Sequence, residues 1–183
     1  VTGTIVIDGD AGDATATLVQ VGGNLTGVVT LDDNSGAVTL EMTGDSTTLG
    51  QTVNGVGDGE GILKLSGTGT TVSSAIGKTG TNSLAAIDVN GTATFDGASE
   101  ATAYTVDADT TFTGAVLANT SFTVDTAGTD VTLSAASDLS LATVTLGTLT
   151  ADALLTTSDL MNTAGKVYLN AASNEMGAGR YAA

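Results

Sequence analysis

The chain repeats one pattern along almost its whole length: a short alternation of apolar residues and threonine, followed by a turn rich in Gly, Asp and Asn. Residues 38–42 precede the turn Gly44-Asp45 in this way, and residues 93–95 precede Asp96-Gly97. Successive side chains of a β-strand point to opposite faces, so this period buries the apolar residues and leaves threonine facing solvent. The pattern predicts an all-β protein.

The turns recur at intervals of about 8 to 12 residues, which is typical of a sandwich, a barrel or a solenoid of short strands. The chain has only three Phe, three Tyr and no Trp, so its core has to consist of stacked aliphatic side chains. A narrow core of this kind favours a β-solenoid with small residues at its corners. A β-sandwich is the alternative, because it would also explain the alternation.

We expect residues 1–183 to form a single β-rich structural domain. The residues predicted to point into its core are mostly aliphatic and come mostly in pairs two positions apart. They are Ile5, Ile7, Val29, Leu31, Val38, Leu40, Met42, Leu63, Leu65, Ile87, Val89, Phe95, Tyr104, Val106, Phe122, Val124, Val131, Leu133, Leu139, Leu141, Val144, Leu146, Val167 and Leu169.

The C-terminal part departs from the strand pattern. Residues 150–162 space their apolar side chains as a short helix would, and Gly165 is placed to end it. Residues 174–183 show no strand alternation. We therefore predict one short helix near the C-terminus, with residues 150–183 acting as a cap or an interface segment.

The composition excludes several classes of function. The formal charge of −16, from 20 acidic and four basic residues, would repel nucleic acid and anionic membrane surfaces. The absence of Cys and His removes disulfides, thiolate or imidazole metal sites and a Ser-His-Asp triad. No stretch reaches the roughly 20 apolar residues of a transmembrane segment. We predict that the protein is not an enzyme.

An acidic turn near the start of the chain is a candidate cation site. Asp8, Asp10 and Asp13 alternate with Gly and Ala, and calcium prefers such clusters of carboxylate oxygens. The turn is not an EF-hand, because Val19 stands where the twelfth-position Glu is needed. Asp8, Asp10 and Asp13 are thus candidate calcium ligands, and the alternative is a solvated turn. The sequence indicates no other cofactor.

Two other kinds of motif occur in the sequence. Asn24, Asn90 and Asn119 each begin an Asn-x-Ser/Thr sequence at a predicted turn and are candidate N-glycosylation sites. The glycine-rich residues 55–61 lack the Lys-Ser/Thr of a phosphate-binding loop and carry two acids, so we expect a flexible turn.

Residues 74–97, SAIGKTGTNSLAAIDVNGTATFDG, resemble the repeats of large bacterial surface proteins written in Gly, Thr, Ala and Asp. This segment is similar to autotransporter passenger regions and to S-layer-like proteins. This resemblance implies an exported β-repeat protein of the cell surface. A first residue, Val1, in place of Met is also what we expect of a processed, exported chain.

These features predict an extracellular structural subunit of a filament, fibre or surface layer that assembles with identical copies. Strand addition would use Thr4, Ile5, Val6 and Ile7. The opposite contact is predicted from apolar residues near the C-terminus, namely Leu154, Leu155, Met161 and Tyr181. An adhesin or passenger segment, or a viral or phage fibre domain, is the alternative function.

Overall fold

The structure is a computed structural model. It describes residues 3–9, 16–33, 36–77, 81–124 and 126–146, and beyond them the backbone of strands within 153–157, 160–162, 167–169, 175–176 and 180–182. The secondary structure of this part consists of strands joined by turns, with no helix. The all-β prediction is confirmed.

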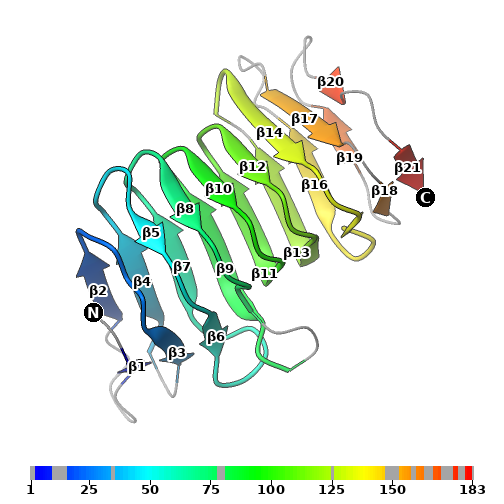
Figure 1. The fold of residues 1–183 in the computed structure, drawn as a ribbon. Helices are drawn as coiled ribbons and strands as arrows, with labels where there is room; N and C mark the ends of the chain where they lie inside the picture. Colours follow the sequence, from blue (N-terminus) through cyan, green and yellow to red (C-terminus); the bar gives the residue numbers. More distant parts are fainter. Residues whose placement is uncertain are drawn as a thin grey trace.

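The strands line up on three faces of one coil (Figure 1). Face A contains β1 (Thr4–Asp8), β3 (Val28–Asp32), β6 (Val53–Gly55), the first halves of β11 (Ser99–Val106) and β13 (Val116–Val124), β15 (Ser137–Asp138), β18 (Leu160–Asn162) and β21 (Arg180–Ala182). Face B contains β2 (Thr17–Val21), β4 (Val38–Met42), β7 (Ile62–Leu65), β9 (Leu84–Val89), the second halves of β11 and β13, β16 (Thr143–Leu146) and β19 (Val167–Leu169). Face C contains β5 (Thr48–Leu49), β8 (Thr70–Val72), β10 (Ala93–Phe95), β12 (Thr110–Phe112), β14 (Thr129–Leu133), β17 (Ala153–Thr157) and β20 (Glu175–Met176).

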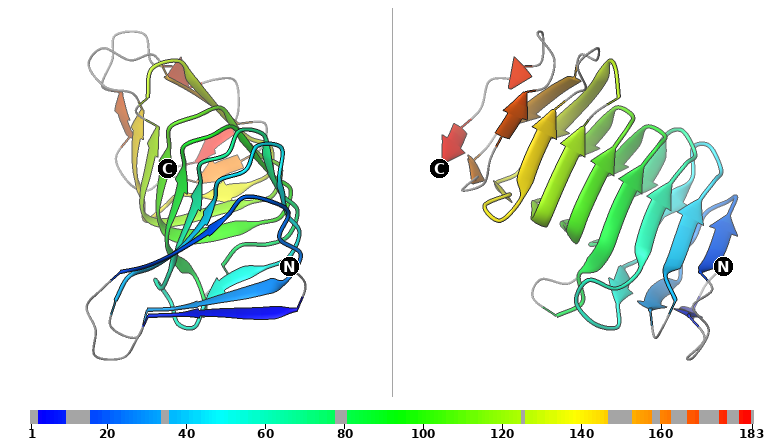
Figure 2. Two further views of the ribbon diagram at one scale, coloured as in Figure 1. Left: turned by 90° about the vertical axis from the view of Figure 1, so that its left-hand side faces the viewer. Right: turned by 180° about the vertical axis from the view of Figure 1, so that it is seen from behind.

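Each turn of the chain places one segment on each face, and the next turn stacks upon it. Every strand pairing in the described part is parallel. Register partners lie 24 residues apart for Val29 and Val53, but only 17 apart for Ala93 and Thr110. Six steps of pairing lead from β2 through β4, β7, β9, β11 and β13 to β16, so this part of the coil makes about six turns. Seen from its end, the coil shows its turns lying behind one another (Figure 2). The β-solenoid is confirmed over the sandwich, whose sheets are antiparallel.

The core is a set of columns in which each residue packs on its register partner one turn away. On face B one column runs through Leu40, Leu63, Ile87, Tyr104 and Phe122, each with at most 1% of its surface exposed. Burial of one such aliphatic side chain stabilises the fold by about 1.5–3 kcal/mol. The coil is therefore held by many equivalent contacts of medium-sized residues.

The four aromatic side chains that the structure describes gather in consecutive turns of the coil. The rings of Phe95 and Phe112 stack with their centroids 4.6 Å apart, and the Tyr104 ring lies 5.4 Å from that of Phe122. The hydroxyl of Tyr104 donates a hydrogen bond of 3.1 Å to the buried Oγ of Ser99. The aromatic side chains thus fill the interior rather than a surface platform.

Most predicted core positions are buried, with two kinds of error. Leu141 is 72% exposed, because a hydrogen bond from the Ala142 amide to the Leu139 carbonyl closes a turn that points Leu141 outwards. Ile5 is only half-buried. The analysis also missed residues that are each the only large apolar inward side chain of a very short strand or bridge, where there is no apolar alternation to detect: Leu25, Leu49, Val53, Val72, Ile76 and Phe112. It also missed Leu84 and Val116, which are the first residues of the longer strands β9 and β13. The side chains of Leu146, Val167 and Leu169 lie outside the described residues.

The predicted C-terminal helix is wrong. Residues 153–157 and 160–162 are the strands β17 and β18, and the tail contributes β20 and β21. The apolar spacing alone would allow a helix here. Pairing with the open backbone edges of β14 and β15 outweighs that local preference, and β17 and β18 pair with them in register. The strands of residues 150–183 continue the coil, and a role as cap or interface stays a prediction.

Stacked glycines form the corner between faces B and C. A Cβ on Gly44 would overlap the carbonyl oxygen of Gly22, one on Gly67 that of Gly44, and one on Gly91 that of Gly67. Beside this column Thr47 Oγ1 donates to the Gly44 carbonyl at 3.0 Å, and Thr70 Oγ1 donates to the Gly67 carbonyl at 3.2 Å. Only the absence of a side chain lets the turns stack this closely.

We expect Gly67→Ala to lower the free energy of unfolding by about 1–3 kcal/mol, because the added methyl meets backbone atoms that cannot move independently. Gly23→Ala is the matched control, since a Cβ at Gly23 meets nothing within 4 Å, and its stability should stay close to that of the wild type. Urea unfolding followed by circular dichroism measures both. Equal stability of the two variants would show that the glycine column is not a packing constraint.

Candidate functional site

The predicted calcium site is described only in part. Asp8 is exposed at the end of β1, where it lies in register with Asp32 of β3. Asp10 and Asp13 lie outside the described residues. The part of the chain that the structure describes holds no group of three or more acidic side chains arranged for a metal ion. Calcium binding at this turn stays a prediction.

Other acidic turns use their carboxylates to hold the backbone. Asp33 Oδ1 accepts a hydrogen bond of 2.8 Å from the Val38 amide. Asp109 Oδ1 accepts one of 2.9 Å from the amide of Asp130, one turn further on. Each such bond provides an acceptor for a backbone N–H that has no carbonyl partner in the strand ladder at a corner of the coil. These carboxylates therefore have a structural role.

The glycine-rich loop of residues 55–61 is folded by its own acids. Glu60 Oε2 accepts from the Gly57 amide at 2.9 Å, and Asp58 Oδ1 accepts from the Ser83 amide at 3.1 Å. The side-chain amide of Asn82 donates to the Gly55 carbonyl at 3.0 Å. The Gly57 amide of the loop is thus engaged by a carboxylate of the same loop, which agrees with our rejection of a phosphate-binding loop.

A polar row crosses the outer surface of face B. Gln20, Glu41, Lys64 and Asp88 occupy the same register position on β2, β4, β7 and β9. Glu41 is 7% exposed, accepts hydrogen bonds from the Gln20 amide at 2.7 Å and from the Ser66 hydroxyl, and lies 3.5 Å from the Lys64 ammonium. Side-chain contacts thus join Gln20, Glu41 and Lys64 across three successive turns, and Asp88 continues the row in register.

The environment shifts the pKa values of the two carboxyl groups of this row, those of Glu41 and Asp88, in opposite directions. Hydrogen bonds from Gln20 and Ser66, with a smaller contribution from the Lys64 charge, lower the pKa of Glu41. Burial raises the pKa of Asp88, against the attraction of Lys64 and with added repulsion from Asp107. Compared with the unfolded chain, the folded state thus stabilises the ionised form of Glu41 and disfavours the ionised form of Asp88.

Glu41→Gln should cost about 1 kcal/mol of stability at neutral pH, where the wild-type carboxylate receives its hydrogen bonds. The difference between wild type and variant is full above the unfolded pKa of about 4.3 and disappears as the pH falls through the lowered folded pKa. Urea unfolding between pH 3 and pH 7 measures it. A difference that does not change with pH would contradict the prediction.

Asp88→Asn should act with the opposite sign. Because the folded pKa of Asp88 is raised, the charged group opposes folding at neutral pH, and this cost disappears below the unfolded pKa. The variant should be more stable than the wild type at pH 7 and equally stable at pH 3 in the same unfolding experiment. A variant that is less stable at pH 7 would show that the electrostatic attraction of Lys64 outweighs burial.

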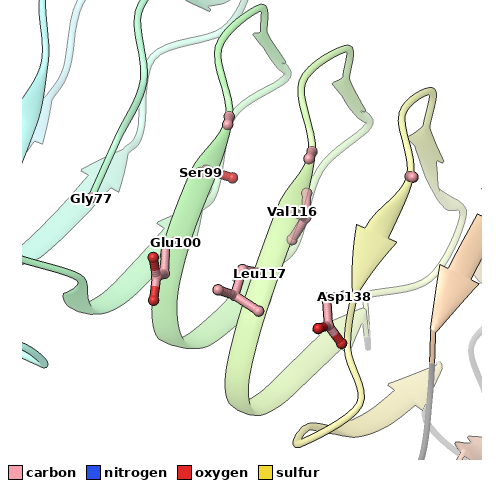
Figure 3. Close-up of a pocket in the computed structure, with 9 residues that line it drawn as sticks. Gly77, Ser99, Glu100, Val116, Leu117 and Asp138 are labelled. Atoms are coloured by element: carbon pink, nitrogen blue, oxygen red, sulfur yellow. The ribbon is translucent and has the colours of Figure 1, made fainter. Parts of the chain in front are cut away.

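A cavity of about 180 Å³ opens on face A (Figure 3). Glu100, Leu117 and Asp138 project from β11, β13 and β15 at its wall, with Leu117 between the two acids in register. Glu100 is 5% exposed, whereas Asp138 is exposed. Below them the Ser137 hydroxyl accepts a hydrogen bond of 3.0 Å from the Val116 amide. The intervening leucine separates the acids, so they do not form one chelating group.

The predicted interface residues fall at both ends of the coil. Thr4, Ile5, Val6 and Ile7 lie in β1, which pairs with β3 on one side only among the described strands. Leu154 and Leu155 lie in β17, Met161 in β18 and Tyr181 in β21, and their side chains lie outside the described residues. The structure does not bring these two groups together within one chain.

The three candidate glycosylation residues differ in their setting. Asn24 and Asn90 are exposed at turns, as predicted. Asn119 is half-buried inside β13, so its placement at a turn was wrong. It lies where the pairing of β13 with β11 shifts register and the strand bends from face A to face B. A strand that continues around a corner carries no turn signal in its sequence.

No protein-family model matches the chain, and no curated protein or solved structure matches it significantly. Among the described residues there is no helix of the length and apolarity that bilayer crossing requires. The candidate functional surfaces are therefore identified from their geometry: the open first turn, the polar row of face B, the cavity of face A and the outer surface of face C.

Proposed function

We propose that the protein is a structural subunit of an extracellular filament, fibre or surface layer, and that identical copies assemble end to end. The supporting observation is the open first turn of the coil. No described strand pairs with the outer edges of β1 and β2, and two apolar side chains there, Val6 and Leu18, are 62% and 55% exposed. An unpaired edge with apolar side chains is a template for a strand of another copy.

The direction of the strands supports this mode of assembly. All pairings are parallel, so a second copy placed on the first turn continues the ladder with the same polarity. The strands β19, β20 and β21 are the last on their faces and lie at the opposite end from β1 and β2 (Figure 1). Contact between unlike ends is heterologous and propagates into open polymers. With a charge of −16 per chain, assembly should be favoured by salt or divalent cations.

The role that we propose is non-catalytic. The carboxylates of Asp33, Asp58, Glu60 and Asp109 accept hydrogen bonds from the backbone, and that of Glu41 is held by neighbouring side chains. Location at the cell surface rests on the resemblance of residues 74–97 to bacterial surface repeats. An adhesin or passenger segment, or a viral or phage fibre domain, is the alternative, and it differs in being able to act as a single copy.

Assembly is tested by light scattering and electron microscopy over a range of protein, salt and calcium concentrations. We expect filaments or sheets for the wild type and their loss in Leu18→Glu, which adds a charge to the open edge. Leu141→Glu is the matched control, because Leu141 is also an exposed leucine but lies in a turn away from the first turn. A wild type that stays monomeric at high concentration, with and without calcium, would overturn the proposal in favour of the adhesin.

A further inference from the structure

Threonine occupies the same outward position on successive strands of face C. Register pairing joins Thr48 to Thr71, Thr71 to Thr94, Thr94 to Thr111 and Thr111 to Thr132. The backbone register continues to Thr156 in β17. We call Thr48, Thr71, Thr94, Thr111 and Thr132 the threonine column. Its strands lie side by side in Figure 1.

The fold makes the threonine column a regular array. Neighbouring strands in a ladder are about 4.8 Å apart, so the column repeats its hydroxyl and methyl groups at that spacing. Threonine is β-branched, which restricts its χ1 rotamers, and each of the five side chains is half-buried. Beneath the column Leu49, Val72, Phe95, Phe112 and Leu133 are fully buried and hold the strands in place.

The array is neutral on a strongly acidic protein. None of its members is charged, although the chain carries −16 overall. The outward positions two residues further on add hydroxyl groups from Ser73, Thr113 and Ser134, and Asp96 is the acid at these positions. Asp109 and Asp130 lie on the other margin, where the Asp109 carboxylate accepts from the Asp130 amide. A neutral, mixed apolar and hydroxyl surface is complementary to an uncharged partner with its own regular repeat.

We propose that the threonine column of face C binds ice. The surface of an ice crystal is an uncharged lattice of water whose oxygen rows repeat at nearly the spacing of β-strands. Threonine methyl groups order adjacent water, and their hydroxyl groups donate to and accept from it. This inference is independent of the assembly proposed above, because face C lies on the side of the coil and not at its ends.

The observations favour ice over the other occupants of such a face. A crystalline sugar polymer would call for exposed aromatic rings, whereas Phe95, Phe112, Phe122 and Tyr104 are all fully buried. A protein partner would call for a charge-depleted core of large apolar or aromatic side chains, which the outward residues of these strands do not provide. A cation would call for clustered carboxylates, and the column has none.

The test measures the freezing hysteresis of the purified protein and its adsorption to a growing ice crystal from buffer. The wild type should depress the freezing point and adsorb. Thr94→Tyr with Thr111→Tyr, in the middle of the column, should abolish both effects, because the larger side chains interrupt the array. Thr71→Tyr, in another turn, is a second variant and should reduce them. Circular dichroism and thermal unfolding confirm that each variant is folded.

The matched control is Thr123→Tyr. Thr123 is also a half-buried outward threonine, in a shorter column on face B with Thr105 and Thr145, and its variant should keep the wild-type hysteresis. A folded wild type without hysteresis or adsorption would overturn the proposal. Loss of activity in Thr123→Tyr with retention in the face C variants would also overturn it, because the active surface would then be face B. Binding to crystalline cellulose but not to ice would assign the column to a sugar lattice instead.

Discussion

The parallel backbone ladder is the interaction on which the rest of this structure depends. Each turn of the coil donates and accepts hydrogen bonds with the turn before and the turn after it, and this pairing sets the register of every side chain. The core columns, the polar row of Gln20, Glu41, Lys64 and Asp88, and the threonine column follow from it. A residue type repeated at the right interval in the sequence becomes a straight row in space, either inside the coil or on its surface.

The corners impose a second requirement that the ladder alone does not meet. Where Gly22, Gly44, Gly67 and Gly91 stack, adjacent turns approach so closely that no side chain fits between them. At other corners a carboxylate takes over a backbone amide that has no strand partner, as Asp109 does for Asp130. The high content of Gly and Asp thus follows from the structural requirements of the corners. Several of the acidic side chains hold the backbone of the coil in place.

The sequence predicted the fold class because its strand alternation and small turn residues are local signals. Ile87 and Val89, or Leu63 and Leu65, show two inward residues and were recognised as core. Leu49 or Ile76 supplies a single inward residue, so burial there is decided only by the register with neighbouring turns. The helix predicted over residues 150–162 failed for a similar reason, since apolar spacing does not reveal an open strand edge next to it. The sequence did not reveal the threonine column, because its members are separated by turns of unequal length, from 17 to 23 residues.

The contact pattern of the coil also determines how it comes apart. Among the described strands, backbone pairing joins each turn only to the adjacent turns, so no described pairing links the first turn directly to the last. We therefore expect loss of structure to begin at a terminus and to proceed inwards, and to reach the aromatic turns around Phe95, Phe112 and Phe122 last. Under a pulling force along its axis, we expect the turns of such a chain to unfold one after another, each absorbing part of the mechanical energy.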